Sequence, residues 1–336
     1  MNMLANLFGR LALTIWTGLA LILGLMGAGV TTTYAQGFPA KPLRIVIPFP
    51  PGGGTEVVAR SLGDQFTKTF GQPVLVENRP GGNSVIASEI VAKAAPDGHT
   101  LLMTTDFHAI NAAFGIALPY DSLKDFAFIA QLTTSPLMLV AHPSTGAKTI
   151  PELIEAARAH PGKLSFASLG SSSPHYLGFE WFKQLARIQM IDVPYKGGGQ
   201  AAADVLGGQV NLMFIVAGNG IRQARAGKFV PIAVTSDKRA AVAPEVPTIA
   251  ESGFPGYALV NWYVMLAPAG TPRDVVAKLN AEIVRSLHLP AVIERLAGAG
   301  LDAAPSSPED AEAHVRREID KYRRIIALTG AKPEGR

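Results

Sequence analysis

The chain has 336 residues, of which 48% are hydrophobic, and it contains no cysteine. The absence of thiol groups excludes disulfides, thiolate metal sites and a lipoprotein anchor. The formal net charge is only +4, from 30 basic and 26 acidic residues. Because the basic residues are scattered and not interleaved with aromatic ones, we expect no nucleic-acid partner.

The first 36 residues differ in kind from the rest of the chain. Arg10 is their only charged residue, and it precedes an apolar run over residues 11–30 that leads into small residues up to Ala35. This order is typical of a secretory signal peptide over residues 1–35, cleaved after Ala35. The apolar run is also long enough to span a bilayer, so a retained membrane anchor is the alternative. We expect the remaining chain to be exported to the periplasm.

After the leader, predicted strands alternate with predicted helices. Residues 43–49 are predicted to form the first strand, followed by a helix whose apolar side chains recur every four residues from Val58 to Phe70. Alternation of this kind predicts an α/β fold with a mainly parallel sheet, and the chain length favours two domains. Further strands are expected at 74–77, 100–104, 128–132, 137–141, 164–167, 191–193, 210–216 and 231–235, a helix at 85–94, and helix starts near Thr149, Thr271 and Ser307.

The first predicted strand runs into a glycine-rich turn, residues 48–56, directly before a helix. In open α/β sheets ligands bind beyond the carboxyl ends of the strands, and a helix start offers free backbone amides to an anion. Three consecutive glycines, Gly52 to Gly54, let an anion approach the backbone without a Cβ in the way. The turn is not a P-loop and lacks the third glycine of the dinucleotide fingerprint, so we expect no nucleotide cofactor. A tight turn without a ligand is the alternative.

Two later turns between a strand and a helix carry similar groups. Residues 168–175 contain four serines and His175, which makes them a second candidate seat for an anion. Residues 195–200 contain Tyr195 and three glycines, and are predicted to line the same opening. Serine caps and glycine turns are common in proteins, so a purely structural role is the alternative for each segment.

A series of short motifs extends these observations along the chain from Lys41 to the C-terminal helix. They are KPLRIVIPF at 41–49, VENRPGGN at 76–83, APDGHTLL at 95–102, PYD at 119–121 with DF at 125–126, VPYKGG at 193–198, LGGQV at 206–210, VPTIAESG at 246–253 and APAGTP at 267–272. In this order the motifs resemble those of the tripartite tricarboxylate transporter receptors, also called Bug-type extracytoplasmic solute-binding proteins.

The resemblance implies a two-lobed periplasmic binding protein of type II, a clamshell in which each lobe is a central sheet flanked by helices. Residues 37–133 and 258–336 would form lobe 1, and residues 134–257 would form lobe 2. The implied function is a periplasmic receptor that captures a small carboxylate-bearing molecule in the cleft between the lobes. It would deliver this ligand to the membrane subunits of a tripartite tricarboxylate-type transporter or serve in sensing. We expect a monomer.

The resemblance also implies how the ligand is held, by backbone amides and hydroxyls from both lobes and partly through ordered waters. Several uncharged donors on a preorganised backbone can hold an anion without a buried arginine. The predicted ligand-binding residues are Pro51, Gly52, Gly53, Thr55, Asp106 and His108 on lobe 1, and Ser168, Ser171, Ser173, His175, Tyr195 and Ile215 on lobe 2.

Three parts of the sequence depart from the family pattern. Glu56 stands where an aspartate is common, Asp106 and Phe107 stand where small residues are frequent, and Ile215 stands where many relatives have an aspartate. Without that aspartate an ammonium group has no acidic partner, so the site is expected to favour an apolar or aromatic carboxylate over an amino acid. Alternatively Ile215 packs in the core of lobe 2, and Asp106 or Glu56 supplies the missing carboxylate.

A secreted α/β enzyme that acts on a small carboxylate is the competing functional class. The chain has seven histidines, but none lies in an H-E-x-x-H motif, and no G-x-S-x-G elbow is present. His108 and His175 could still meet across a cleft with Asp106, which keeps the alternative open. We nevertheless expect no catalytic residues, no metal and no cofactor.

Overall fold

A computed structural model describes residues 37–333. The predicted signal peptide, residues 1–35, lies outside the described residues. Every helix and strand given below belongs to one compact unit, Lys41–Arg336. Within the described residues, no helix is both long enough and apolar enough to cross a membrane.

The strands of the described chain alternate with helices, as expected, but they form a mixed sheet. They are β1 (Leu43–Ile47), β2 (Val74–Asn78), β3 (Thr100–Thr105), β4 (Phe126–Ala141), β5 (Ser165–Ser168), β6 (Ile191–Pro194), β7 (Leu212–Val216), β8 (Val230–Val234), β9 (Val260–Pro268) and β10 (Asp302–Ala303). Their order is β2-β1-β3-β9-β4-β7-β5-β6, with β8 and β10 also paired to β4.

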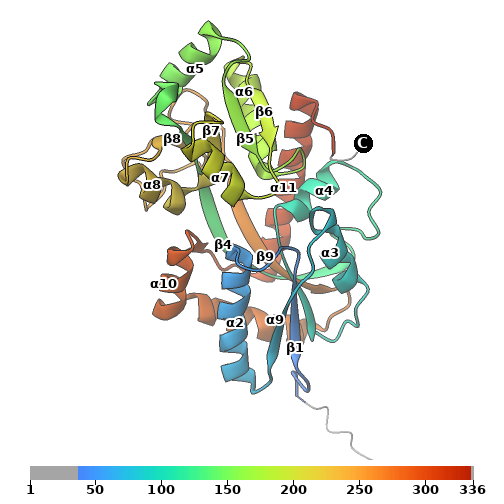
Figure 1. Cartoon of the computed structure of the whole chain (residues 1–336). Coiled ribbons are helices and arrows are strands. Elements are labelled where there is room, and N and C mark those ends of the chain that lie inside the picture. Colours follow the sequence, from blue (N-terminus) through green and yellow to red (C-terminus); the bar gives the residue numbers. More distant parts are fainter. Residues whose placement is uncertain (1–36, 334–336) are drawn as a thin grey trace, which may run out of the picture. The chain divides into compact units, whose positions relative to one another are not determined.

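The helices pack around these strands (Figure 1). They are α2 (Gly54–Phe70), α3 (Val85–Ala92), α4 (Phe107–Ala113), α5 (Ile150–Ala159), α6 (Pro174–Ala186), α7 (Gly198–Leu206), α8 (Ala217–Arg225), α9 (Arg273–Leu287), α10 (Pro290–Gly298) and α11 (Pro308–Thr329), with short 3₁₀ helices at Gly82–Ser84 and Pro143–Thr145. Two predicted caps are confirmed, because Thr149 accepts a hydrogen bond from the Glu152 amide and Ser307 accepts one from the Asp310 amide. Thr271 instead donates to the Pro268 carbonyl, and the neighbouring Pro272 is the cap of α9.

The expectation of a mainly parallel sheet is wrong, because two strands join separate groups of parallel strands. Strands β2, β1 and β3 are parallel to one another, and so are β6, β5 and β7. Strands β4 and β9 pair antiparallel with each other, and β4 also pairs antiparallel with β7 and β8. The two strands expected at 128–132 and 137–141 are therefore the two ends of one long strand, β4.

Strand β4 belongs to both groups of strands. Its residues 126–136 pair with β9, in what we call the first strand group, together with β1, β2, β3 and β10. Its residues 137–141 pair with β7 and β8, in the second strand group, together with β5 and β6. Figure 1 shows β4 and β9 side by side between the two groups. The predicted lobe boundary at 133/134 falls inside β4, and the division into lobes at these residues stays a prediction.

The C-terminal helix α11 joins the cores of both strand groups. Its buried side chains recur every three or four residues, from Ala311 through Val315, Ile319 and Tyr322 to Ile325. This apolar face packs against α4, β4 and α6. Side chains of both strand groups and of α11 therefore form one continuous cluster of buried apolar residues.

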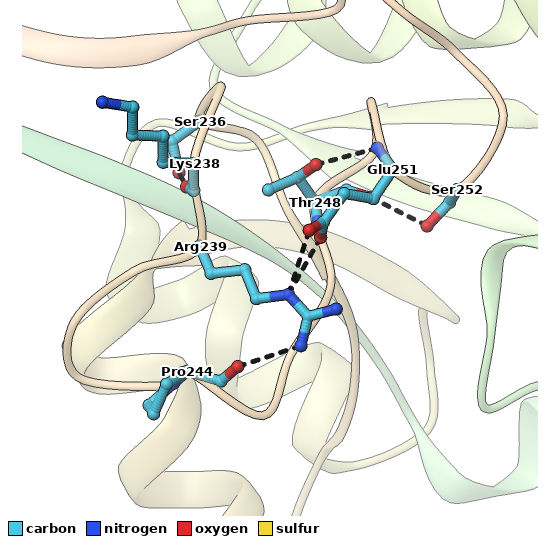
Figure 2. Close-up of polar contacts among 7 residues, drawn as sticks. All are labelled: Ser236, Lys238, Arg239, Pro244, Thr248, Glu251 and Ser252. Atoms are coloured by element: carbon cyan, nitrogen blue, oxygen red, sulfur yellow. Dashed lines mark hydrogen bonds and ion pairs between the residues drawn. The ribbon is translucent and has the colours of Figure 1, made fainter.

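The segment between β8 and β9 is held by hydrogen bonds rather than by regular structure. The Thr248 amide donates to Oε2 of Glu251 (2.8 Å), and the Glu251 amide donates to Oγ1 of Thr248 (2.9 Å). Arg239 Nε donates to the same carboxylate (3.0 Å), and its Nη1 donates to the Pro244 carbonyl (3.1 Å), as Figure 2 shows. Within the motif VPTIAESG, Thr248 and Glu251 thus form the reciprocal hydrogen bonds of a capping box, and Arg239 binds the same carboxylate.

Candidate functional site

The glycine turn lies where β1 ends and α2 begins, as predicted. Pro51, Gly52 and Gly53 are exposed. Gly52 has φ of +94°, which a residue with a side chain rarely adopts, whereas Gly53 is extended and precedes the first helical residue. A Cβ added at Gly53 would meet only Oγ1 of Thr55, at 3.8 Å, so nothing in the protein occupies the space above this residue.

One amide of the turn is already occupied by the protein's own carboxylate. Gly52 N donates to Oε2 of Glu56 (2.6 Å), while Arg60 Nε donates to Oε1 of the same side chain (2.7 Å). These two contacts hold the pKa of Glu56 below its ordinary value. Both carboxylate oxygens of Glu56 are therefore already hydrogen-bonded, one to the turn and one to Arg60. The amides of Gly53, Gly54 and Thr55 donate no hydrogen bond within the described residues and remain for an external anion.

Tyr263 on β9 lies against this helix start and was not predicted from the sequence. A Cβ added at Gly54 would lie only 3.0 Å from the Tyr263 hydroxyl oxygen and 3.5 Å from Leu301 Cδ1. Gly54 is thus needed for the close approach of the tyrosine. Burial, and to a lesser extent the nearby Asp106 carboxyl, raise the pKa of Tyr263 well above its ordinary value, so its hydroxyl stays protonated and able to donate.

Asp106 lies at the end of β3, one strand away from the glycine turn. Its side chain is 2% exposed, and its Oδ2 has no hydrogen-bond partner within the described chain. Burial raises the pKa of Asp106 to about 7, and the nearby Glu318 carboxylate adds to the shift, while Thr105 and Lys321 oppose it. At neutral pH this carboxyl is therefore divided between its neutral and its charged form.

His108 lies in the core next to Asp106. Its Nε2 lies 2.8 Å from the Ser122 carbonyl, to which it donates, and its ring stacks on Tyr120 and meets the edge of Phe126. Burial lowers the pKa of His108 to about 4, so the ring is neutral at pH 7. This environment favours a structural role for His108 over the predicted contact with a ligand. Its neighbour Phe107 instead meets Phe49, at the end of β1, edge to face.

The serine turn between β5 and α6 divides into structural and free groups. Ser173 caps α6, because its Oγ accepts from the Tyr176 amide and donates to the Gly170 carbonyl. Ser168 Oγ is buried near the Asp192 carboxyl without reaching hydrogen-bond geometry. Ser171 is half-buried, and His175 has a buried Nδ1 without a partner and a pKa lowered to about 4 by burial.

The last two predicted residues make contacts within the protein. The Tyr195 hydroxyl donates to Oδ2 of Asp204 (2.7 Å), and burial together with this carboxylate raises the pKa of Tyr195 to about 12. Ile215 pairs with Met138 across β7 and β4 and packs against the apolar core of the second strand group. A Cβ added at Gly220 would lie 3.0 Å from Ile215 Cγ2. These contacts support the alternative in which Ile215 is a packing residue.

The predicted residues gather in two sets, each at the carboxyl edge of parallel strands. Because β1 pairs with β3, the glycine turn and Asp106 follow adjacent strands of the first strand group. In the second strand group, Ser168 is the last residue of β5 and Tyr195 follows the adjacent strand β6, and the Tyr195 amide donates to the Ser168 carbonyl (2.9 Å). The groups of the two sets without a hydrogen-bond partner among the described residues include the amides before and within the first turn of α2, Asp106 Oδ2, Ser168 Oγ and His175 Nδ1.

A known family matches most of the chain. Residues 58–330 match the model of the tripartite tricarboxylate transporter family receptor. The chain belongs to this receptor family. The predicted family is thereby confirmed, and the receptor is a solute-binding protein, a class that is distinct from enzymes.

Two relatives resemble the receptor over most of their length. A UPF0065 protein in the tcbD-tcbE intergenic region of Pseudomonas sp. strain P51 is 36% identical over 290 residues, or 86% of each chain. Protein BugT of Bordetella pertussis is 33% identical over 300 residues, which are 89% of the receptor and 92% of BugT.

Solved structures confirm the predicted fold class of a two-lobed periplasmic binding protein. Rpa4515 of R. palustris with adipate is 31% identical, with a TM-score of 0.80 over 88% of the receptor and 99% of that chain. The periplasmic binding protein BugD is 31% identical, with a TM-score of 0.77 over the same shares. MatC from Rhodopseudomonas palustris with bound malate is 33% identical, with a TM-score of 0.76 over 86% of the receptor and 100% of that chain.

Proposed function

We propose that the receptor is exported to the periplasm, where it captures a small carboxylate-bearing molecule. It then presents this ligand to the membrane subunits of a tripartite tricarboxylate-type transporter or serves in sensing. The family and the adipate and malate held by two similar proteins support a carboxylate ligand. The observation that carries the proposal is the start of α2, with free amides and open space above Gly53.

In this proposal the ligand's carboxylate lies on the amides around Gly53 and Thr55. The positive end of the helix dipole favours an anion there, and charge-assisted hydrogen bonds from the amides fix its position. Ser168, Ser171 and His175 contribute neutral polar groups from the second strand group. Because Glu56 already holds Gly52, the ligand is seated by the later amides of the turn.

The substitution Gly53→Val tests this seat. Gly53 is extended and its Cβ position is open, so valine fits without strain and the variant should fold like the wild type. Its two methyl groups stand where the carboxylate would lie. We expect at least a tenfold loss of affinity, measured by calorimetric titration with the acid that co-purifies with the receptor and is identified by mass spectrometry after denaturing release.

Gly298→Val is the matched control, because Gly298 is also exposed with open space at its Cβ but lies at a helix end. It should bind the acid as the wild type does. The acid should be recovered chemically unchanged after binding, as a receptor requires and an enzyme does not. Equal affinity of Gly53→Val and the wild type would rule out the turn as the seat.

Export is tested by the intact mass of the protein in a periplasmic extract. We expect a mass that lacks residues 1–35, because the charge-poor leader ends in small residues up to Ala35. A full-length mass in the membrane fraction would instead show that the leader is retained as an anchor.

A further inference from the structure

Strand β9 presents two polar side chains on the face that meets the start of α2. Trp262 donates its Nε1 to Oε2 of Glu318 (3.1 Å) and therefore faces α11. Since successive side chains of a strand point to opposite faces, Asn261 and Tyr263 face the other way. The 3.0 Å approach of the Tyr263 hydroxyl to the Cβ position of Gly54 agrees with this direction.

Both side chains lack the hydrogen bonds that buried polar groups normally make. Asn261 is half-buried, and its Oδ1 is shielded from solvent without a partner among the described residues. Tyr263 is also half-buried, and no described group hydrogen-bonds to its hydroxyl. Unsatisfied buried polar groups are rare in folded proteins because they forfeit hydrogen bonds to water. The shielded oxygen of Asn261 and the hydroxyl of Tyr263, which lie on one face of the strand, are therefore free to bind a polar group from outside the chain.

Their place in the sheet puts these two residues between the two strand groups. Tyr263 pairs with Thr105 of β3 and with Thr133 of β4, and Asn261 pairs with Ser135 of β4. Two residues beyond Ser135, at Leu137, β4 begins to pair with β7 and β8 of the second strand group. A ligand seated on the first turn of α2 thus meets Tyr263 first and Asn261 next along β9.

We propose that Asn261 and Tyr263 bind a second polar group of the ligand, so that the receptor selects an acid with a further hydroxyl or carboxyl group over an apolar acid. This inference rests on the proposed function. The amide of Asn261 offers a donor and an acceptor, and the hydroxyl of Tyr263 can donate or accept. Both can therefore bind a hydroxyl or a carboxyl group.

The selection depends on whether Asn261 and Tyr263 keep hydrogen-bond partners when a ligand binds. An apolar end placed against Asn261 and Tyr263 removes the remaining water and leaves both groups unsatisfied. A polar end replaces that water with direct hydrogen bonds. The expectation of an apolar or aromatic ligand rested on Ile215, which packs against the core of the second strand group. In this proposal the polar residues of β9 therefore determine the selectivity.

Calorimetric titrations with butyrate, succinate and malate test the inference. All three acids have four carbons, and they carry in turn a terminal methyl group, a second carboxyl group, and a second carboxyl group with a hydroxyl group. The test variants are Tyr263→Phe and Asn261→Leu, which remove polar groups at nearly constant volume. The control variants are Tyr322→Phe, which removes a buried unpartnered hydroxyl, and Thr134→Val, whose side chain shares the Trp262 face of the sheet.

We expect wild-type receptor to bind succinate or malate at least tenfold more tightly than butyrate. Each test variant should lower that preference at least fivefold, whereas both controls should keep it within twofold. Melting temperatures check that each variant is folded, and Asn261→Ser replaces Asn261→Leu if the leucine variant melts lower.

Three results would overturn the inference. Butyrate could bind as tightly as the two polar acids, the test variants could keep the wild-type preference, or none of the three acids could bind. In each case the proposed function is judged separately, by the effect of Gly53→Val on the acid that co-purifies. If that acid is lost from Gly53→Val, the function stands and only the role of Asn261 and Tyr263 falls.

Discussion

At the scale of single residues, Asp106 shows how burial changes the chemistry of a carboxyl group. An ordinary aspartate is charged at neutral pH, but Asp106 is 2% exposed and its Oδ2 has no partner among the described residues. The surroundings disfavour the charged form, which raises the pKa to about 7. The folded protein therefore holds a proton at Asp106 that the unfolded chain releases above about pH 4.

This difference predicts that Asp106→Asn stabilises the receptor in alkaline but not in acidic solution. With the pKa raised on folding, the wild type loses stability as the pH rises from about 4 to 7, and the loss is complete above pH 7. Asparagine does not titrate, so at pH 8 the variant should be more stable than the wild type. We expect a difference of roughly 1–3 kcal/mol in the free energy of unfolding, which is less than the full free-energy equivalent of the pKa shift. Urea unfolding at pH 4.5 and pH 8 measures the difference.

The comparison must be made between variant and wild type because two histidines titrate in the same range. Burial lowers the pKa values of His108 and His175 to about 4, so both cost stability as the pH falls from about 6.5 to 4. Their effect has the opposite sign but is common to both proteins. A difference in unfolding free energy that stays constant between pH 4.5 and pH 8 would contradict the raised pKa of Asp106.

The sequence predicted the position of these residues better than their roles. It placed Asp106 and His108 after a strand, next to the glycine turn, and this is where they lie. It could not show that His108 turns into the core toward Ser122, because this direction depends on contacts 14 residues apart. Nor could the sequence identify Tyr263. This residue is far from Gly54 in the chain, and the register of β9 in the sheet brings the two together.

At the scale of elements, the segment between β8 and β9 depends on a few polar contacts. Glu251 accepts hydrogen bonds from the Thr248 amide and from Arg239, while Val234 at the end of β8 bonds to both sides of the capping box. The carboxylate of Glu251 has a lowered pKa, mainly because of the bond from the Thr248 amide. One exposed side chain thereby orders a stretch that has no regular structure of its own.

We expect Glu251→Ala to loosen this segment without unfolding the receptor. The change removes the reciprocal capping contact and leaves Arg239 without its carboxylate, at a cost of about 1 kcal/mol. Limited digestion with trypsin should then cut faster after Lys238 or Arg239 than in the wild type. Glu245→Ala is a suitable control, because Glu245 is also exposed and paired with an arginine but lies outside the capping box. Equal rates of cleavage in both variants would refute this role.

Helices and strands were predicted well where neighbouring residues in the sequence determine them, and less well where contacts with distant residues do. Hydroxyl caps such as Thr149 and Ser307 are marked by residues within one helical turn, and the structure confirms both. The continuity of β4 was missed because Thr133, Thr134, Ser135 and Pro136 interrupt its apolar pattern. These four residues still belong to the strand because β9 pairs with them throughout, which the local sequence does not show.

At the scale of the whole molecule, the fold class followed from the motifs, but the mixed sheet did not. Strands β4 and β9 are far apart in the chain, so only the complete topology reveals that they pair antiparallel between two parallel groups. The proposed capture of a ligand between lobes depends on these two strands, because the chain passes from one strand group to the other through β4 and returns through β9. Any opening and closing must bend the chain there.

We expect ligand binding to shift the receptor from an open to a closed population. A ligand that touches both lobes binds the closed form better, and it can shift the equilibrium only by that difference. Small-angle scattering should give a smaller radius of gyration with saturating ligand than without it. The Gly53→Val variant at the same ligand concentration is the control and should keep the larger radius. An unchanged radius in the wild type would mean a site that is closed in advance or confined to one lobe.

The continuous core around α11 also has a consequence for how the protein is made. This helix packs against β4, α4 and α6, yet it comprises residues 308–329 and is the last helix of the described residues. Strand β3 similarly pairs with β9, which begins about two thirds of the way along the remaining chain. Early segments thus cannot bury their apolar faces until the end of the chain is available. We therefore expect folding to finish late in synthesis, which would suit the proposed export, because a chain that is still unfolded can pass through a narrow secretion channel.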